Sequence, residues 1–152
     1  MKDEDLLDMN RRLKEMIQRT SEEFEFLVKS QEFSLTLHYS KGVQYLSLVR
    51  QKDPEGNCVG LTWKRYRPSS KGRVWLKGWS VPNTPAGMLT SRMYPNDALM
   101  FKELHGLAKE AVKLRKELVS KKRRVQATYQ AIKTFEGSHM KQYEQKRDEI
   151  FI

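Results

Sequence analysis

A basic and aromatic stretch near the middle of the chain, residues 58–81, most constrains how this sequence folds. It contains all three tryptophans and six lysines or arginines, but no acidic residue. Its two halves alternate in polarity as strands do, and residues 68–72 between them have the composition of a turn. The stretch therefore predicts a β-hairpin around which the rest of the chain is arranged.

The alternation predicts one aliphatic face of this hairpin and one face that mixes rings with cations, because successive side chains of a strand point to opposite sides. Leu61 and Trp63 belong to the first of these faces. The residues assigned to the mixed face are Lys64, Tyr66, Arg73, Trp75, Lys77 and Trp79. Three further cations are assigned to the hairpin tip, namely Arg65, Arg67 and Lys71.

Two interpretations of the mixed face stay open from sequence alone. Its rings could stack on exposed bases while its cations hold the phosphate backbone, as in proteins that bind single-stranded nucleic acid. Alternatively, Trp75 and Trp79 could be buried under a helix while the lysines reach past them to water. Both fit the same alternation.

Charge is concentrated in the same region. The chain has a net charge of +10, and residues 41–81 hold nine basic and two acidic residues, whereas residues 1–40 hold six basic and nine acidic ones. A concentrated positive field attracts polyanions, and lysine-rich surfaces also keep small domains in solution. A second basic cluster, predicted either to contact phosphates or to be a solvated part of a helix, consists of Lys121, Lys122, Arg123 and Arg124.

The remaining pattern predicts an α+β fold in one domain of 152 residues, with a four-stranded antiparallel meander flanked by an N-terminal helix and a long C-terminal helix of coiled-coil character. The expected order is a helix to residue 30, a sheet over 33–81, a loop over 82–95, a helix over 96–136 capped by Asn96, and a short helix or tail over 138–150. The apolar stripe expected on the long helix consists of Leu104, Leu107, Ala111, Leu114, Leu118, Val125, Ile132 and Phe135.

The sequence does not indicate an enzyme. Its three histidines lie far apart and lack neighbours at metal-ligand spacing, so neither a metal site nor a cofactor is predicted. Cys58 is interpreted as a small buried residue, and a lone cysteine favours a reducing, cytoplasmic location. No apolar run approaches the roughly 20 residues of a membrane span, so no membrane association is expected.

Several short segments resemble the MobI family of conjugative-transfer accessory proteins, which mobile genetic elements encode. These segments are Tyr45-Leu46-Ser47-Leu48, Trp63-Lys64-Arg65-Tyr66-Arg67, Lys71-Gly72, and Tyr94-Pro95 with Ala98-Leu99. The resemblance covers residues 33–118, while the 82–93 segment and the longer C-terminal helix depart from it. It implies recognition of origin-of-transfer DNA and help in assembling a relaxase complex, without nuclease activity, and it transfers no catalytic residue.

The sequence therefore leaves two alternative functions open. The first is a cytoplasmic DNA-binding accessory protein of a mobile element or phage, which contacts nucleic acid through the hairpin and a partner or a second copy through its helices. The second is a phage-borne inhibitor or adaptor that docks on a host nucleoprotein complex through protein contacts alone.

Overall fold

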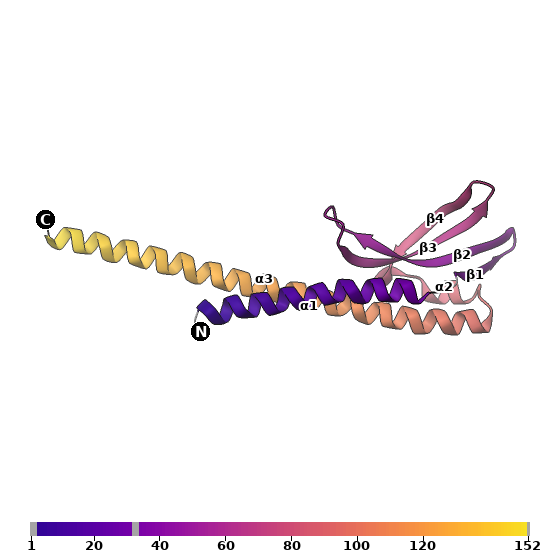
Figure 1. The fold of residues 1–152 in the computed structure, drawn as a ribbon, viewed down its shortest axis with the longest axis horizontal. Helices are drawn as coiled ribbons and strands as arrows, with labels where there is room; N and C mark the ends of the chain where they lie inside the picture. The colour runs from indigo at the N-terminus through magenta and orange to yellow at the C-terminus, as the bar shows by residue number, and fades with distance from the viewer. Residues whose placement is uncertain (1–2, 32–33, 152) are drawn as a thin grey trace. The chain divides into compact units, whose positions relative to one another are not determined.

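The computed structural model describes residues 3–31 and 34–151 and confirms the α+β architecture (Figure 1). A helix, a four-stranded antiparallel sheet and a long C-terminal helix follow one another. The elements are α1 (Asp3–Ser30), β1 (Leu35–Tyr39), β2 (Gly42–Lys52), β3 (Cys58–Ser69), β4 (Gly72–Ser80), the 3-10 helix η1 (Val81–Asn83), α2 (Ala86–Thr90) and α3 (Pro95–Phe151). Phe33, the expected start of the first strand, lies outside the described residues.

The sheet is a meander with strand order β1-β2-β3-β4. Two-residue turns join β1 to β2 and β3 to β4, and Gly72 after the second turn has a φ of +108°, a conformation that glycine adopts without strain. The predicted hairpin is therefore present, but its turn is shorter than the expected 68–72. Pro68 pairs with Arg73 at the end of β3 instead of forming part of the turn.

Contacts divide the chain into two compact units. One contains Gln18–Lys116, and the other contains Met1–Ile17 with Glu117–Ile152. We call the first the sheet unit and the second the helical unit. Both α1 and α3 contribute a segment to each, and the interpretation of the whole chain as a single domain stays a prediction.

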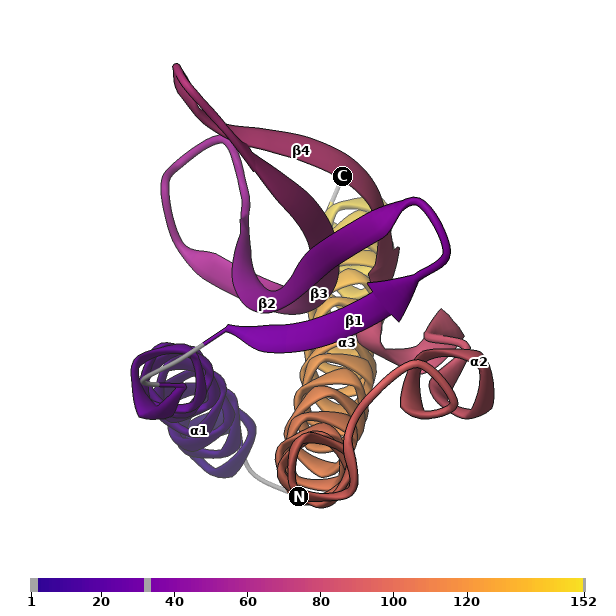
Figure 2. The same cartoon turned by 90° about the vertical axis from the view of Figure 1, so that its right-hand side faces the viewer.

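The sheet unit has one hydrophobic core, in which helices cover one face of the sheet (Figure 2). Trp63 of β3 is fully buried there, and its ring centroid lies 4.9 Å from that of Phe101 of α3. Strand β2 adds Leu46 and Leu48, and α1 adds Phe24. The face predicted to be aliphatic is thus the one that packs on the helices.

The apolar stripe of α3 differs from the predicted one. Phe101 and Ala108 are fully buried, whereas Leu107 and Leu114, which were expected in the stripe, are 54% and 48% exposed. The reason is that Trp63 contacts Phe101 and His105, which turns that side of the helix towards the sheet. A regular spacing of leucines did not predict this rotation because the aromatic contacts are non-local.

The bounds of α3 also correct the prediction at both ends. The helix begins at Pro95, and the carbonyl of Tyr94 accepts the first helical bond from Ala98 N at 2.9 Å, so Asn96 is not the cap. It continues through Gly137 and Ser138 to Phe151, where a break and a short helix or tail were expected. Glycine costs about 1 kcal/mol in a helix interior, which weakens α3 at Gly137 without ending it.

The segment predicted as a loop over 82–95 contains η1 and α2. Hydrogen bonds close the short helix α2, including one from Leu89 N to the carbonyl of Pro85 at 3.1 Å. Leu89 is fully buried in the core of the sheet unit. The prolines thus start short helices rather than only interrupting structure.

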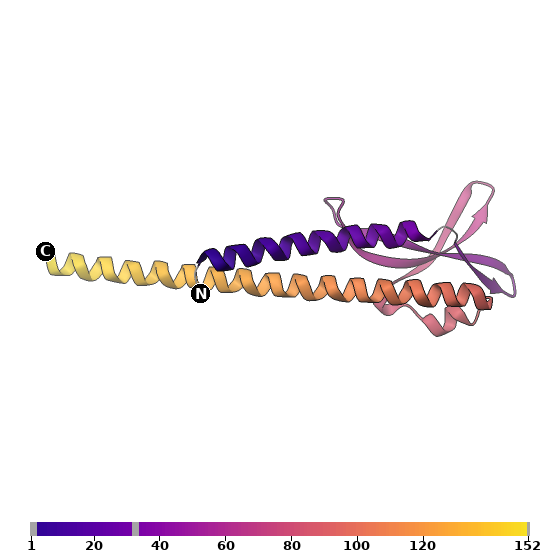
Figure 3. The same cartoon turned by 60° about the horizontal axis from the view of Figure 1, so that its bottom comes forward.

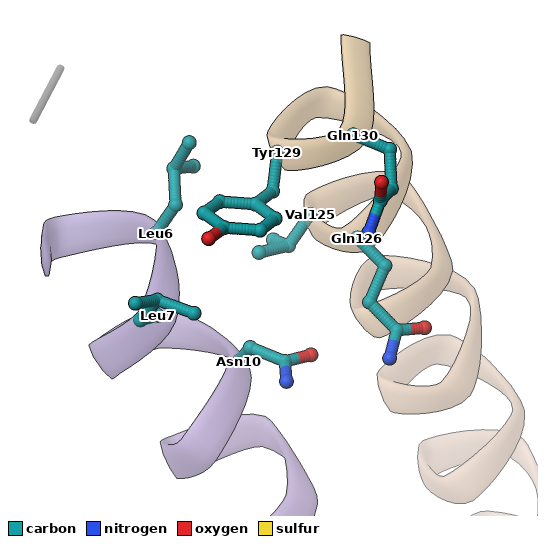
Figure 4. Close-up of a pocket in the computed structure, with 7 residues that line it drawn as sticks. All are labelled: Leu6, Leu7, Asn10, Val125, Gln126, Tyr129 and Gln130. Carbon is teal, nitrogen blue, oxygen red and sulfur yellow. The ribbon is translucent and has the colours of Figure 1, made fainter. Parts of the chain in front are cut away.

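In the helical unit, the first part of α1 lies beside the later part of α3 (Figure 3). Leu6 and Tyr129 point towards one another across a small pocket of about 190 Å³ (Figure 4). Lys133 of α3 pairs with Asp3 of α1. The two helical segments therefore make both apolar and charged contacts within this unit.

Candidate nucleic-acid interface

The face of the sheet that points away from the helices holds a group of rings and cations, which we call the open-face cluster. Tyr45, Tyr66 and Trp75 are direct cross-strand neighbours on β2, β3 and β4. Lys64 and Arg73 complete the cluster. Cross-strand pairs lie close enough for rings to touch, so the register alone brings these residues together.

The three rings form a continuous row. The centroids of Tyr45 and Tyr66 are 5.5 Å apart with an interplanar angle of 27°, and those of Tyr66 and Trp75 are 5.2 Å apart at 60°. The hydroxyl of Tyr66 donates a hydrogen bond to Ser34 Oγ at 2.7 Å, which fixes the central ring. Tyr66 is 7% exposed while Trp75 is 43% exposed, so the row has a buried centre and an accessible end.

The cations of this cluster lie over the rings rather than beside carboxylates. The guanidinium carbon of Arg73 lies 4.6 Å from the Tyr66 centroid, and Lys64 Nζ lies 5.6 Å from the Trp75 centroid. Within residues 3–31 and 34–151, neither cation forms an ion pair with an acidic group. Their charge is therefore available to an anionic ligand.

A β-bulge divides the predicted mixed face between the two sides of the sheet. Lys64 pairs with Gly78 and Tyr66 pairs with Trp75, so two residues of β4, Leu76 and Lys77, lie opposite the single residue between them on β3. The extra residue reverses the alternation of β4. Strict alternation had placed Trp75 and Trp79 on one face, and that prediction is wrong.

Trp79 consequently lies on the side of the sheet that faces the helices. It pairs with Trp63 and packs against the core. Trp79 is partly buried, as the second interpretation expected, whereas Trp75 is exposed on the open face and its contact with bases stays a prediction. Gly78 allows β4 to approach, since a Cβ there would lie 2.7 Å from Lys64 Cγ.

Arg65 is not at the hairpin tip, as the sequence had suggested, but is half-buried in the middle of the hairpin, opposite the bulge. Its Nη1 donates a hydrogen bond to Tyr39 Oη at 2.9 Å, and its guanidinium carbon lies 5.2 Å from the Trp79 centroid. Arg67 and Lys71 do lie at or near the tip and are exposed. Of the predicted site residues, only Lys64, Tyr66, Arg73 and Trp75 thus share the open face.

The second basic cluster lies in the helical unit. Lys121 and Arg124 line a hollow of about 500 Å³ together with Arg12 of α1. Lys122 and Arg123 line another, of about 320 Å³, together with Lys14. The four residues thus surround α3, and α1 adds two cations that the sequence did not single out.

Two other reactive side chains of the sheet unit, His105 and Cys58, are buried. Trp63 Nε1 donates a hydrogen bond to His105 Nδ1 at 3.0 Å, and burial, followed by the charge of Lys109, lowers the pKa of His105. Burial raises the pKa of the Cys58 thiol, which keeps it neutral.

The described residues contain no group of three or more potential metal ligands. No described helix is both long and apolar enough to cross a membrane.

Sequence reasoning missed three residues that contact the predicted ones. Tyr45 could have been found by pairing β2 with β3 in register, because it lies directly opposite Tyr66. Tyr39 contacts Arg65, and Arg92 contacts Tyr39 in turn. No local pattern signals these contacts because the segments are distant along the chain.

Comparisons with family models, with curated proteins and with solved structures find no match to this chain.

Proposed function

We propose that this protein is a non-catalytic nucleic-acid-binding accessory protein that uses the open face of its sheet to hold a strand. The observation that supports this most is the open-face cluster, in which three rings in contact lie next to two cations that have no acidic partner among the described residues. Rings that stack on bases and cations that hold phosphates are the combination that proteins use for single strands.

A base should bind an exposed ring of the cluster more strongly than the cation that lies over it. A cation over an exposed ring gains about 0.5–1 kcal/mol, whereas stacking of a base on an aromatic side chain gains about 1–3 kcal/mol. A base can therefore displace Lys64 from the Trp75 face, and the freed ammonium group can bind the adjacent phosphate. Tyr66 then supports Trp75 from below without contacting the ligand.

We place this activity in the cytoplasm and in the context of a mobile genetic element or phage, with DNA as the ligand. The lone cysteine and the resemblance to the MobI family support this context. The basic cluster at Lys121–Arg124 would add phosphate contacts that raise affinity without reading sequence.

Fluorescence anisotropy with labelled single-stranded DNA, duplex DNA and RNA across a salt titration tests the proposal. Trp75→Ala should weaken single-strand binding about 10-fold, the equivalent of one lost stacking contact, with the salt slope unchanged. Arg73→Gln should weaken binding and reduce the slope by about 0.7. Lys102→Gln, which removes an exposed charge from α3, serves as the control and should leave affinity near that of the parent.

Two results would contradict the proposal. One is the absence of binding to any of the three nucleic acids at low salt. The other is a Trp75→Ala variant that binds as tightly as the parent chain. Circular dichroism on each variant separates a lost contact from a lost fold.

A second role, contact with a partner through α3, is supported by one specific observation. Met100, Leu107 and Leu114 recur every seven residues, and each is about half exposed. Such a stripe suits a second copy of the chain or a protein of a host nucleoprotein complex. Light scattering on the parent and on a Leu107→Lys, Leu114→Lys variant tests self-association, and a monomeric parent would leave the host partner as the candidate.

A further inference from the structure

The sheet has a second group of rings and cations on its helix-facing side, which we call the helix-side cluster. It consists of Arg65 of β3, Lys77 and Trp79 of β4, Tyr39 of β1, and Arg92 of the segment between α2 and α3. We propose that this cluster is a phosphate-binding site, separate from the open face.

Three cations lie over two rings in this cluster. The guanidinium carbon of Arg92 lies 4.2 Å from the Tyr39 centroid, and that of Arg65 lies 5.8 Å from the same centroid. Lys77 Nζ lies 5.7 Å from the Trp79 centroid, and Arg65 also contacts that ring. In the described chain, none of the three cations pairs with a carboxylate. Arg65 is half-buried while Lys77 and Arg92 are exposed, and an anion bound among them would offset their like charges.

The cluster also has more hydrogen-bond donors than acceptors, although Arg65 Nη1 donates both to Tyr39 Oη and, at 3.4 Å, to Gln44 Oε1. Arg65 Nε is buried and has no partner among the described residues. Tyr39 Oη accepts a bond from Arg65, and its own proton finds no acceptor in the described part of the chain. Among the described residues, the guanidinium of Arg92 lies over a ring face and forms no ion pair with a carboxylate. Donors without acceptors are what an oxyanion requires, and guanidinium groups match the oxygen spacing of phosphate.

Backbone structure holds these donors in place. The β-bulge lies opposite Arg65 and thereby brings Lys77 and Trp79 to its side of the sheet. His38 N donates a hydrogen bond to the carbonyl of Arg92 at 2.7 Å, which attaches the Arg92 segment to the free edge of β1. Because both attachments are made by the main chain, the side chains are held near one another without a ligand.

The first experiment titrates inorganic phosphate into the full-length chain at constant ionic strength and follows the Arg65 Nε–Hε and Trp79 Nε1–H resonances by NMR. Saturable shifts of both are expected. Arg92→Gln should weaken phosphate binding about 10-fold, the effect of losing one charge-assisted contact. Arg19→Gln removes the same charge from an exposed position of α1 and should bind phosphate as the parent does. Arg92 is exposed, so its substitution leaves the core intact.

Binding measurements with oligonucleotides and with a nucleoside monophosphate distinguish the possible sources of the phosphate group. If a 5′-phosphorylated oligonucleotide binds more tightly than its 5′-hydroxyl counterpart, and only with Arg92 present, the ligand is a strand end. Equal, Arg92-dependent binding of both assigns the site to internal phosphates, and Arg92-dependent binding of a nucleoside monophosphate alone assigns it to a free nucleotide.

The proposal fails if the resonances respond equally to phosphate and to chloride, if acetate binds as tightly as phosphate, or if Arg92→Gln and Arg19→Gln behave alike. This outcome is distinguishable from failure of the open face. Trp75→Ala should retain phosphate binding even where it loses the strand.

Discussion

At the scale of single residues, Trp63 shows how one buried contact orients a whole helix. Its indole nitrogen donates to His105, and the His105 ring in turn stacks on Phe101, with centroids 5.1 Å apart and an interplanar angle of 10°. Sequence alternation placed Trp63 correctly on the buried face. It could not identify His105 as its partner, because 42 positions separate the two residues and hydrogen bonds between side chains leave no periodic signal.

The Trp63–His105 contact predicts that stability falls on mild acidification. Burial lowers the pKa of His105 below its ordinary value of 6.5, so between the folded-state pKa and 6.5 the unfolded chain binds more protons. The contribution of His105 is therefore complete above about pH 6.5 and is lost as the pH falls towards the folded-state value. Urea unfolding between pH 5 and pH 8 should show this trend.

Substitution of individual histidines isolates this contribution. His105→Gln should reduce the pH dependence of the free energy of unfolding, while His139→Gln, on an exposed position of the same helix, should keep that of the parent. Equal pH dependence in the parent and in His105→Gln would contradict the assignment.

At the scale of elements, the β-bulge in β4 marks the limit of what alternation can predict. The strands, their order and the buried face of β3 all follow from polar and apolar periodicity, and the structure agrees with each. The assignment of Trp75 and Trp79 to one face failed, because a single extra residue reverses the phase and depends on pairing with β3. Gly78 is the one local hint, since glycine inside a strand often accompanies a bulge.

Substitution of glycine by alanine should change the free energy of unfolding in opposite directions at two positions in different elements. Gly106 lies inside α3, where an added Cβ meets nothing within 4 Å, so Gly106→Ala should stabilise the fold by about 1 kcal/mol. At Gly78 a Cβ would lie 2.7 Å from Lys64 Cγ and 3.2 Å from the Trp63 carbonyl, so Gly78→Ala should destabilise by about 1–3 kcal/mol. Urea unfolding followed by circular dichroism measures both, and a shared sign would contradict the prediction.

At the scale of the whole molecule, the hydrophobic core belongs to one of the two units. All of its buried members, from Phe24 to Ala111, lie within residues 18–116. The heptad pattern in α3 continues past this limit, which is why sequence analysis expected one apolar stripe for the whole helix. Local spacing cannot predict where a core ends, because that depends on which strands are present to cover the helix.

A fragment of residues 18–116 should therefore fold without the helical unit. It retains the core, the open-face cluster and the helix-side cluster. We expect cooperative unfolding and a Trp63 Nε1–H resonance like that of the full-length chain. We also expect single-strand DNA affinity within about 10-fold of the full chain and a smaller salt slope, because the fragment lacks Lys121–Arg124.

The full-length chain provides the control for this fragment. Hydrogen exchange on it should show slower exchange for the amides of the sheet unit than for those of α3 beyond residue 116, because the main cluster of buried hydrophobic residues lies in the sheet unit. An unfolded fragment, or uniform protection along α3, would mean that the helical unit stabilises the sheet. An unchanged salt slope in a folded fragment would instead remove Lys121–Arg124 from the binding surface and leave the sheet as the only contact with the strand.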